Sequence, residues 1–196
     1  CILQNRKEQI VEDIVQELNN IDGTLEMHFI DVGQADCILI KQNDEIMLVD
    51  AGTMSSADKV VNYLKSLNIT KIDILVATHQ RHDHIGGMSK ILDNFEVGVI
   101  YMPDLGKEKI DTKSYKSFIS SIEKWEQKEE NEVLFAKDEE ENLRKFDLGQ
   151  ANVRFIVPTC NWYRTKNNYS IVMRITFGKT SILLTADAEK NLKWKW

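Results

Sequence analysis

The sequence predicts an α/β sandwich, in which helices lie outside packed sheets, rather than an all-parallel doubly wound sheet. Two blocks of strand-like segments, one early and one late in the chain, are interleaved with helical patterns. The chain has 196 residues, which is room for one domain of ordinary size, and 42% of them are apolar, enough to enclose a core. A single layered domain is therefore expected.

The first expected element is an amphipathic helix over about residues 4–20. Its apolar side chains recur at the three- and four-residue spacing of one helical face: Ile10, Val11, Ile14, Val15 and Leu18. From Thr24 onward the pattern changes to alternation. We therefore divide the chain into an N-terminal helix at 1–22 and a domain at 23–196.

Three strands are expected next, at 25–29, 37–40 and 46–49. Ser, Ser, Ala and Asp at 55–58 offer helix-capping side chains before a helix over about 56–67. A compact apolar run at 72–77 predicts a fourth strand. It stops abruptly at a polar loop, 78–87, which we place at the C-terminal end of that strand.

The remaining pattern predicts helices at 88–94 and 112–128 and strands at 97–101, 153–157, 170–177 and 180–186. Gly178 and Lys179 fit a tight turn between the last two strands. The charged run at 137–141 is expected in a solvated loop or hairpin rather than in an acidic binding site.

Charge and hydropathy exclude two classes of protein. Lys and Arg number 25 against 31 Asp and Glu, which gives a formal charge of −6. This charge disfavours a large positive surface that binds nucleic acid but allows a local positive patch. The apolar runs are far shorter than the roughly 20 residues that a bilayer-spanning helix needs. No transmembrane segment is expected, and the oligomeric state stays open.

Three of the four histidines, His79, His82 and His84, lie within six residues together with Asp83. Imidazole and carboxylate groups crowded on a short loop supply the lone pairs that zinc and similar divalent cations bind. The loop is therefore a candidate metal site. The fourth histidine, His28, stands alone on an expected strand, and we assign it a structural role.

Five ordered segments resemble the metallo-β-lactamase superfamily, and within it the ComEC-type domain of the bacterial DNA-uptake competence protein. Together they cover almost everything after the first helix: 29–36 (FIDVGQAD), 48–52 (LVDAG), 78–87, 167–172 (NNYSIV) and 183–187 (LLTAD). The resemblance implies a four-layer αββα sandwich with a metal site at the sheet edges.

The same resemblance places His79, Asp83 and His84 on ligand positions of the loop and Asp187 on a carboxylate that bridges two metals. It matches Asp50 to the acidic residue that positions the histidine loop. A bound dication lowers the pKa of its water to about 7, and the resulting hydroxide is the expected nucleophile, held and oriented at Asp83.

Two polar residues, Asn168 and Ser170, match a pair that lies near the site in ComEC-like domains. They are candidates for stabilising the charge that develops on phosphate. The alternative is structural, because Asn168 can make a turn and Ser170 can open a strand.

Two departures from the family pattern concern the metal ligands. Arg81 stands where relatives carry His or Asp, and a guanidinium cannot bind a metal. Arg81 could instead bind a phosphate group of the substrate. Alternatively, the loop bends so that His82 replaces the missing ligand. No histidine follows Asp187, whereas relatives have one there. We therefore expect one ion, Zn²⁺ or Mn²⁺, and a second half of the sandwich that is incomplete or is finished by another chain or segment.

The resulting interpretation is a metal-dependent hydrolase, a phosphodiesterase or nuclease whose substrate could be single-stranded DNA. Two alternatives stay open. One is a catalytically weak metal-binding or interaction module of the same fold, which Arg81 favours. The other is hydrolysis of a carboxylic ester, thioester or lactam, because the same hydroxide attacks a carbonyl carbon. The chain is expected in the cytoplasm or, if Cys1 carries a lipid, anchored outside it.

Overall fold

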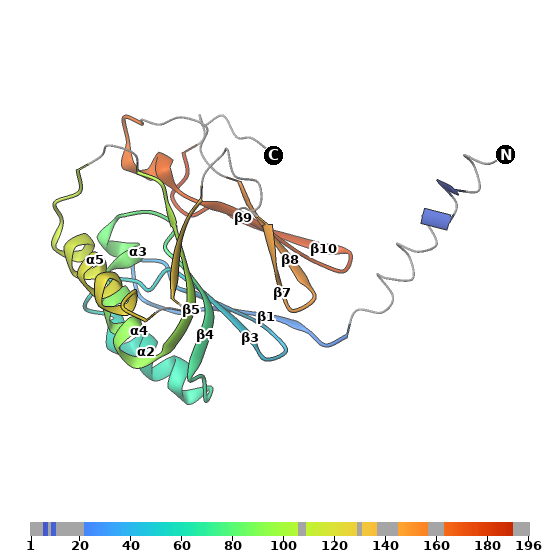
Figure 1. Ribbon diagram of the computed structural model, residues 1–196, viewed down its shortest axis with the longest axis horizontal. Coiled ribbons are helices and arrows are strands. Elements are labelled where there is room, and N and C mark those ends of the chain that lie inside the picture. Colours follow the sequence, from blue (N-terminus) through green and yellow to red (C-terminus); the bar gives the residue numbers. More distant parts are fainter. Residues whose placement is uncertain are drawn as a thin grey trace.

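The computed structural model describes residues 6–7, 9–10, 22–105, 109–128, 131–136, 145–156 and 163–189. Within them, helices cover one face of a larger sheet and a smaller sheet packs on the other face (Figure 1). This confirms the mixed α/β class with two packed sheets. The described residues place no helix on the outer face of the smaller sheet.

The larger sheet has six strands in the order β1-β2-β3-β4-β5-β6. Its first three strands pair antiparallel and the rest pair parallel. The strands are β1 (Leu25–Phe29), β2 (Ile38–Gln42), β3 (Glu45–Val49), β4 (Lys71–Val76), β5 (Glu96–Pro103) and β6 (Glu132–Ala136). Parallel pairing puts the carboxyl ends of β3, β4 and β5 at one edge of the sheet.

The smaller sheet is wholly antiparallel, in the order β10-β9-β8-β7. Its strands are β7 (Lys145–Leu148), β8 (Ala151–Ile156), β9 (Val172–Phe177) and β10 (Thr180–Leu184). A short 3-10 helix, η2 (Lys166–Tyr169), precedes β9. Phe177 pairs with Thr180 across the expected tight turn, and Gly178 adopts the positive φ of 56° that the turn needs.

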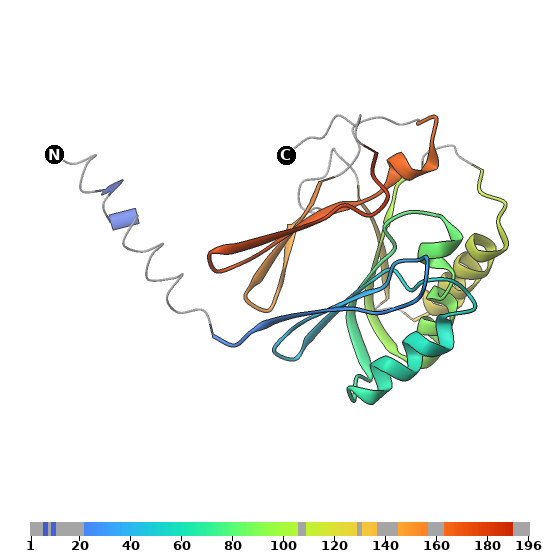
Figure 2. The same cartoon turned by 180° about the vertical axis from the view of Figure 1, so that it is seen from behind.

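Two apolar cores hold the layers together (Figure 2). One lies between the helices and the larger sheet and includes Leu48, Leu75 and Phe118. The other lies between the two sheets, where Val76, Phe155 and Met173 are among the buried side chains. Alternate residues of β4 therefore face opposite cores, which explains why this strand reads as a continuous apolar run.

The helices are α2 (Ala57–Ser66), α3 (His82–Ile85), α4 (Met88–Asn94) and α5 (Lys113–Trp125). Thr112 caps α5 by accepting a hydrogen bond from the Tyr115 N–H. Ser56 precedes α2 without such a bond, because its hydroxyl accepts from the Thr53 N–H instead. None of the described helices is long and apolar enough to cross a membrane.

The structure differs from the sequence expectations in several elements. The sequence analysis missed three short elements, β6, β7 and η2, although polar and apolar residues alternate along β7. The loop at 78–87 contains the helical turn α3, because Ile85 turns inward and is buried in the helix-side core. The charged run at 137–141 and nearly all of the predicted N-terminal helix lie outside the described residues.

Segment 83–87 is held in place by close backbone approach to the segment that follows β3. The Ala51 N–H donates to the His84 carbonyl at 2.8 Å, and the Gly87 N–H donates to the Gly52 carbonyl at 3.2 Å. A Cβ atom at Gly87 would overlap the carbonyl oxygen of Ala51. Glycine at 87 is therefore a condition for seating the histidine loop on the sheet edge.

We expect Gly87→Ala to lower the free energy of unfolding by about 1–3 kcal/mol, because the added methyl has no room against the Ala51 backbone. Urea unfolding measures the change. The control is Lys90→Ala, which removes an exposed pair with Asp58 and should change stability much less than Gly87→Ala. Equal losses in the two variants would contradict a tight approach at Gly87.

Candidate metal centre

The candidate site forms where strands of both sheets end. Asp50 directly follows β3, and Thr78 and His79 come two and three residues after the end of β4. Asp187 follows β10 of the smaller sheet. The Ile171 N–H donates to the Thr78 carbonyl at 2.9 Å, which joins the two sheets at this edge. Residues distant in sequence are thereby brought together.

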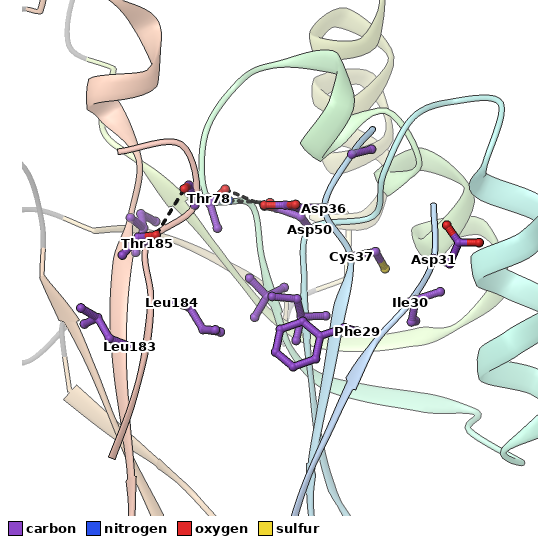
Figure 3. Close-up of a pocket in the computed structure, with 15 residues that line it drawn as sticks. Phe29, Ile30, Asp31, Asp36, Cys37, Asp50, Thr78, Leu183, Leu184 and Thr185 are labelled. Carbon is purple, nitrogen blue, oxygen red and sulfur yellow. Dashed lines mark hydrogen bonds between the residues drawn. The ribbon is translucent and has the colours of Figure 1, made fainter. Parts of the chain in front are cut away.

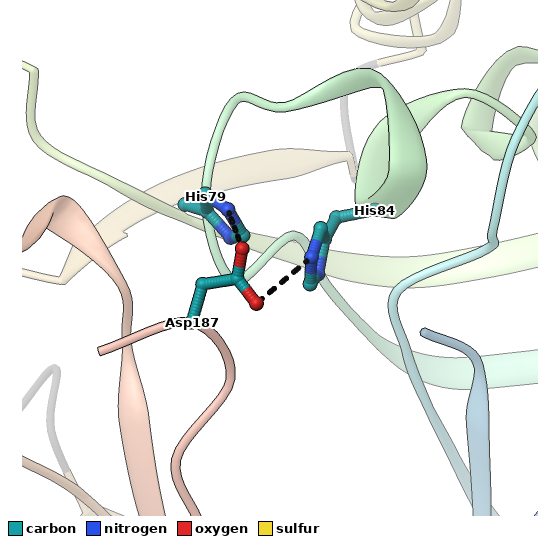
Figure 4. A group of neighbouring side chains, drawn as sticks. All are labelled: His79, His84 and Asp187. Carbon is teal, nitrogen blue, oxygen red and sulfur yellow. Dashed lines mark ion pairs between the residues drawn. The ribbon is translucent and has the colours of Figure 1, made fainter. Parts of the chain in front are cut away.

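His79, His84 and Asp187 form a compact group (Figure 4). The Nε2 atom of His79 lies 3.5 Å from one carboxylate oxygen of Asp187, and that of His84 lies 3.6 Å from the other. The two imidazole rings are 4.0 Å apart between centroids. Two ligands at zinc-bonding distance from one tetrahedral ion stand about 3.3–3.6 Å apart, which these separations match.

Asp50 determines which nitrogen of His84 faces the group. The Asp50 carboxylate is buried and accepts a hydrogen bond from His84 Nδ1 at 2.7 Å. A carboxylate only accepts, so Nδ1 carries the proton and Nε2 can offer a lone pair toward Asp187. Metal-bound histidines are oriented in this way.

Thr78 orients His79 by the same logic. The Thr78 hydroxyl donates to Asp50 Oδ2 at 2.6 Å, so its oxygen can only accept from His79 Nδ1, 3.2 Å away. The lone pair of His79 is then on Nε2, on the side of Asp187. Asp50 thus orients one histidine directly and the other through Thr78.

Among the described residues, four buried side-chain atoms lack hydrogen-bond partners: both amide atoms of Gln80 and, at the site, His79 Nε2 and Asp83 Oδ1. Unpartnered buried acceptors are costly unless a cation or a polar ligand satisfies them. The residues therefore fit a divalent metal, held by two imidazoles and one carboxylate with a coordination position left open. Three protein ligands and one open position are typical of catalytic zinc sites.

The electrostatic setting of the two histidines differs. Burial, together with the neighbouring His84, lowers the pKa of His79 to about 4, which keeps His79 neutral near pH 7. Burial also lowers the pKa of His84, but the hydrogen bond to Asp50 and the charges of Asp50, Asp36 and Asp187 outweigh it, so this pKa is raised. A metal bound at His84 must displace that proton.

Arg81 lies between the carboxylates of the site. Its Nη1 donates to Asp187 Oδ2 at 2.8 Å and to Asn167 Oδ1 at 3.2 Å, and its Nη2 donates to Asp83 Oδ2 at 3.1 Å. The side chain is 39% exposed. The planar guanidinium therefore links the histidine loop to the segments that flank the smaller sheet.

The structure brings three of the five predicted ligands into one group, His79, His84 and Asp187, and leaves Asp83 and His82 outside it. Asp83 is joined to Asp187 through Arg81 rather than directly. His82 is 67% exposed, and its Nδ1 lies 3.6 Å from Asp83 Oδ1. His28, assigned a structural role, bonds to Tyr63 and lies near Glu26, away from the site.

The two predicted polar residues form local contacts. The Ser170 hydroxyl donates to the Asn167 carbonyl at 2.6 Å. The Asn168 amide bonds to the carboxylate and to the backbone N–H of Glu189, two residues after Asp187. Both the catalytic role and the structural alternative stay predictions for these two residues.

Three residues of the site were given no role by the sequence: Asp36, Thr78 and Asn167. All three occur in the segments that carry the family resemblance, which was the available signal. Asp36 forms a second cluster with Asp50 and His84. Burial raises the pKa of the Asp36 carboxyl, and its backbone N–H donates to the Asp83 carbonyl at 3.1 Å.

A cavity of about 410 Å³ adjoins the site (Figure 3). Asp36, Asp50 and Thr78 line one end of it. Farther along, Phe29 of β1 and Leu184 of β10 lie on opposite walls. Phe29 is 70% exposed. The cavity therefore offers a polar end beside the histidines and an apolar mouth between the two sheets.

Comparison with known proteins identifies relatives over most of the chain. ComE operon protein 3 of Bacillus subtilis is 26% identical over 190 residues, covering 85% of this chain and 22% of that protein. Ribonuclease J of Synechocystis is 34% identical over 84 residues, covering 38% and 13%. Hydroxyacylglutathione hydrolase of Aeromonas hydrophila is 33% identical over 67 residues, covering 34% and 25%. The chain thus matches a quarter or less of each relative's length.

Solved structures share the fold. A metallo-β-lactamase of Cronobacter sakazakii described by a HARLDQ motif superposes with a TM-score of 0.55 at 14% identity, covering 84% of this chain and 61% of that one. The metallo-beta-lactamase fold protein YhfI of Bacillus subtilis gives 0.52 at 17% identity, covering 83% and 62%. Over residues 79–84 the present chain reads HQRHDH, which shares His, Arg and Asp with that motif.

The family model described as the metallo-beta-lactamase superfamily matches residues 30–196, which include every described strand except β1 and every residue of the candidate metal group. With the fold and the His, Asp and Arg arrangement already described, this match is decisive. The chain belongs to the metallo-β-lactamase superfamily and, within it, is similar to the ComEC type represented by ComE operon protein 3.

Proposed function

We propose that this chain is a phosphodiesterase that acts on a nucleic-acid strand, with single-stranded DNA as the first candidate. His79, His84 and Asp187 would hold the divalent cation, Zn²⁺ or Mn²⁺. The observation that carries the proposal is the pair of buried imidazoles whose Nε2 lone pairs converge on one carboxylate. Arg81 pairs with Asp187, but His79 Nε2 has no hydrogen-bond partner among the described residues, and a cation bound beside Asp187 would satisfy it.

The proposed reaction divides its tasks among residues already placed. A bound divalent cation supplies activation of water and polarisation of the phosphoryl oxygen. Asp83 Oδ1, buried and without a hydrogen-bond partner, can accept a hydrogen bond from the attacking water and orient it. Asp50 and Thr78 keep the histidine rings in the required tautomer. The cavity beside Asp36 has room for part of the substrate.

Two observations favour phosphodiesters over neutral esters. Arg81 places a permanent positive charge at a site mouth that otherwise carries several carboxylates, and an anionic substrate gains most from it. The Arg81 Nε–H has no hydrogen bond among the described residues, so one donor stays available for phosphate. In addition, one relative is named for cleavage of RNA.

Thioester hydrolysis is the second candidate. The similarity to a hydroxyacylglutathione hydrolase favours it, and the apolar walls at Phe29 and Leu184 suit an acyl group. A catalytically weak metal-binding module would keep the metal without either activity. The three alternatives separate when metal content and turnover are measured on one preparation.

We expect purified protein loaded with Mn²⁺ or Zn²⁺ to cleave bis(p-nitrophenyl) phosphate and a single-stranded oligonucleotide faster than a glutathione thioester. Asp187→Asn should lower phosphodiester turnover by at least about 100-fold, because it removes a charged ligand. The control is Asp58→Asn, which alters an exposed carboxylate paired with Lys90. Faster thioester cleavage would favour the second candidate, and bound metal without any turnover would favour the module.

Asp50→Asn tests how the histidines are oriented. Its amide N–H₂ would replace one carboxylate oxygen beside His84 Nδ1, which must then accept and shift its proton to Nε2. We expect metal affinity to fall about 10–100-fold, measured by competition with a chromophoric chelator. Asp73→Asn is the matched control, since Asp73 accepts from the Ile46 N–H far from the histidines. Unchanged affinity in Asp50→Asn would contradict the assigned tautomers.

A further inference from the structure

We propose that the Arg81 guanidinium acts as a fixed internal cation in place of a second metal ion, so that the centre holds a single ion. The inference rests on the proposed metal binding by His79, His84 and Asp187. It goes beyond that function by assigning the nuclearity of the centre to one side chain and by predicting how the nuclearity can be changed.

The geometry places the guanidinium where it bridges two carboxylates. Its Nη1 lies 2.8 Å from Asp187 Oδ2, and its Nη2 lies 3.1 Å from Asp83 Oδ2. A third contact, 3.2 Å from Nη1 to Asn167 Oδ1, holds the plane in position. A metal ion bound between Asp83 and Asp187 would connect the two carboxylates in the same way.

The two carboxylates that pair with Arg81, those of Asp83 and Asp187, are partly shielded from solvent. The Asp83 side chain is 14% exposed and the Asp187 side chain 29% exposed. Arg81 directly precedes α3, with extended backbone angles, and its carbonyl accepts from the His84 and Ile85 N–H groups. The side chain therefore leaves from a hydrogen-bonded turn, which limits how far the guanidinium can withdraw.

Charge and ligand supply both oppose a second ion beside Arg81. The guanidinium is positively charged and repels a dication placed next to it. It also binds Asp83 Oδ2 and Asp187 Oδ2, which leaves Asp83 Oδ1 and Asp187 Oδ1, and Asp187 Oδ1 already faces His84 Nε2. The neighbouring group of Asp36, Asp50 and His84 shares His84 with the first site, and His84 Nδ1 is hydrogen-bonded to Asp50. A second ion beside Arg81 therefore finds too few free ligands.

The group that would hold the first ion does not include Arg81. The Nε2 atoms of His79 and His84 face Asp187. The candidate ligand atoms of these three residues lie within 4.8 Å of one another. The structure therefore separates the site into a metal-binding half, made by the two histidines, and a half in which the positive charge is built into the chain. Asp187 contacts both halves.

The test is the number of ions bound per chain. Wild-type protein and variants are stripped with chelator, dialysed to equilibrium against Zn²⁺ or Mn²⁺ and assayed by plasma mass spectrometry, with circular dichroism confirming the fold. We expect one ion in the wild type and two in Arg81→His, where an imidazole replaces the cation and both carboxylates are released. Arg81→Gln, which removes the charge with less change in shape, should take up the second ion more weakly.

The matched control is Arg174→His, which adds a histidine on the outer face of the smaller sheet, where Arg174 contacts Ser181. It should stay at one ion. Two ions in the wild type would overturn the inference, and so would one ion in folded Arg81→His and Arg81→Gln. Turnover is scored separately: one ion in the wild type and two in Arg81→His without phosphodiester cleavage would uphold the inference while rejecting the proposed activity.

Discussion

The hydrogen bonds of one buried carboxylate organise the whole site. Asp50 is 1% exposed and accepts from the Thr78 N–H, the Thr78 hydroxyl and His84 Nδ1. A buried charge is costly unless it is fully hydrogen-bonded, so these three donors and Asp50 hold one another in a single arrangement. The left-handed backbone at Asp50, with φ of 57°, turns the chain at the end of β3.

The second constraint is the meeting of the two sheets. Asp187 follows the last strand of the smaller sheet, whereas both histidines belong to a loop of the larger one. The apolar core between the sheets, built from side chains such as Val76, Phe155 and Met173, sets the distance between these elements. Metal binding in this fold therefore depends on side chains that never contact the metal, because packing between sheets decides whether three ligands converge.

Arg81 shows how one substitution can change the chemistry of a shared scaffold. The loop, the glycine contact at Gly87 and the Asp50 network are all present, and Arg81 stands where the family resemblance implies a metal ligand. A guanidinium cannot exchange with solvent ions, so this part of the site keeps its positive charge whatever metal is available. The carboxylates Asp83 and Asp187 are neutralised without a second metal.

Apolar periodicity was sufficient to predict the longer elements, such as β4, α2 and α5. Their buried side chains recur over several helical turns or along the strand. It missed β6, which pairs with β5 across the intervening helix α5, and it missed β7, although β7 forms a local hairpin with β8. It also described 78–87 as a plain loop, since the helical turn at α3 follows from burying Ile85.

The sequence by itself determined the family, the two-sheet α/β class and the histidine loop, because ordered motifs and apolar spacing are local properties of the chain. Only the tertiary structure decided that Arg81 is shared between Asp83 and Asp187, that His82 points away from the group and that Thr78 orients His79. Arg81 meets Asp187 from 106 positions away, and Thr78 orients His79 only because Asp50 of another strand end accepts the Thr78 hydroxyl, so folding establishes both outcomes.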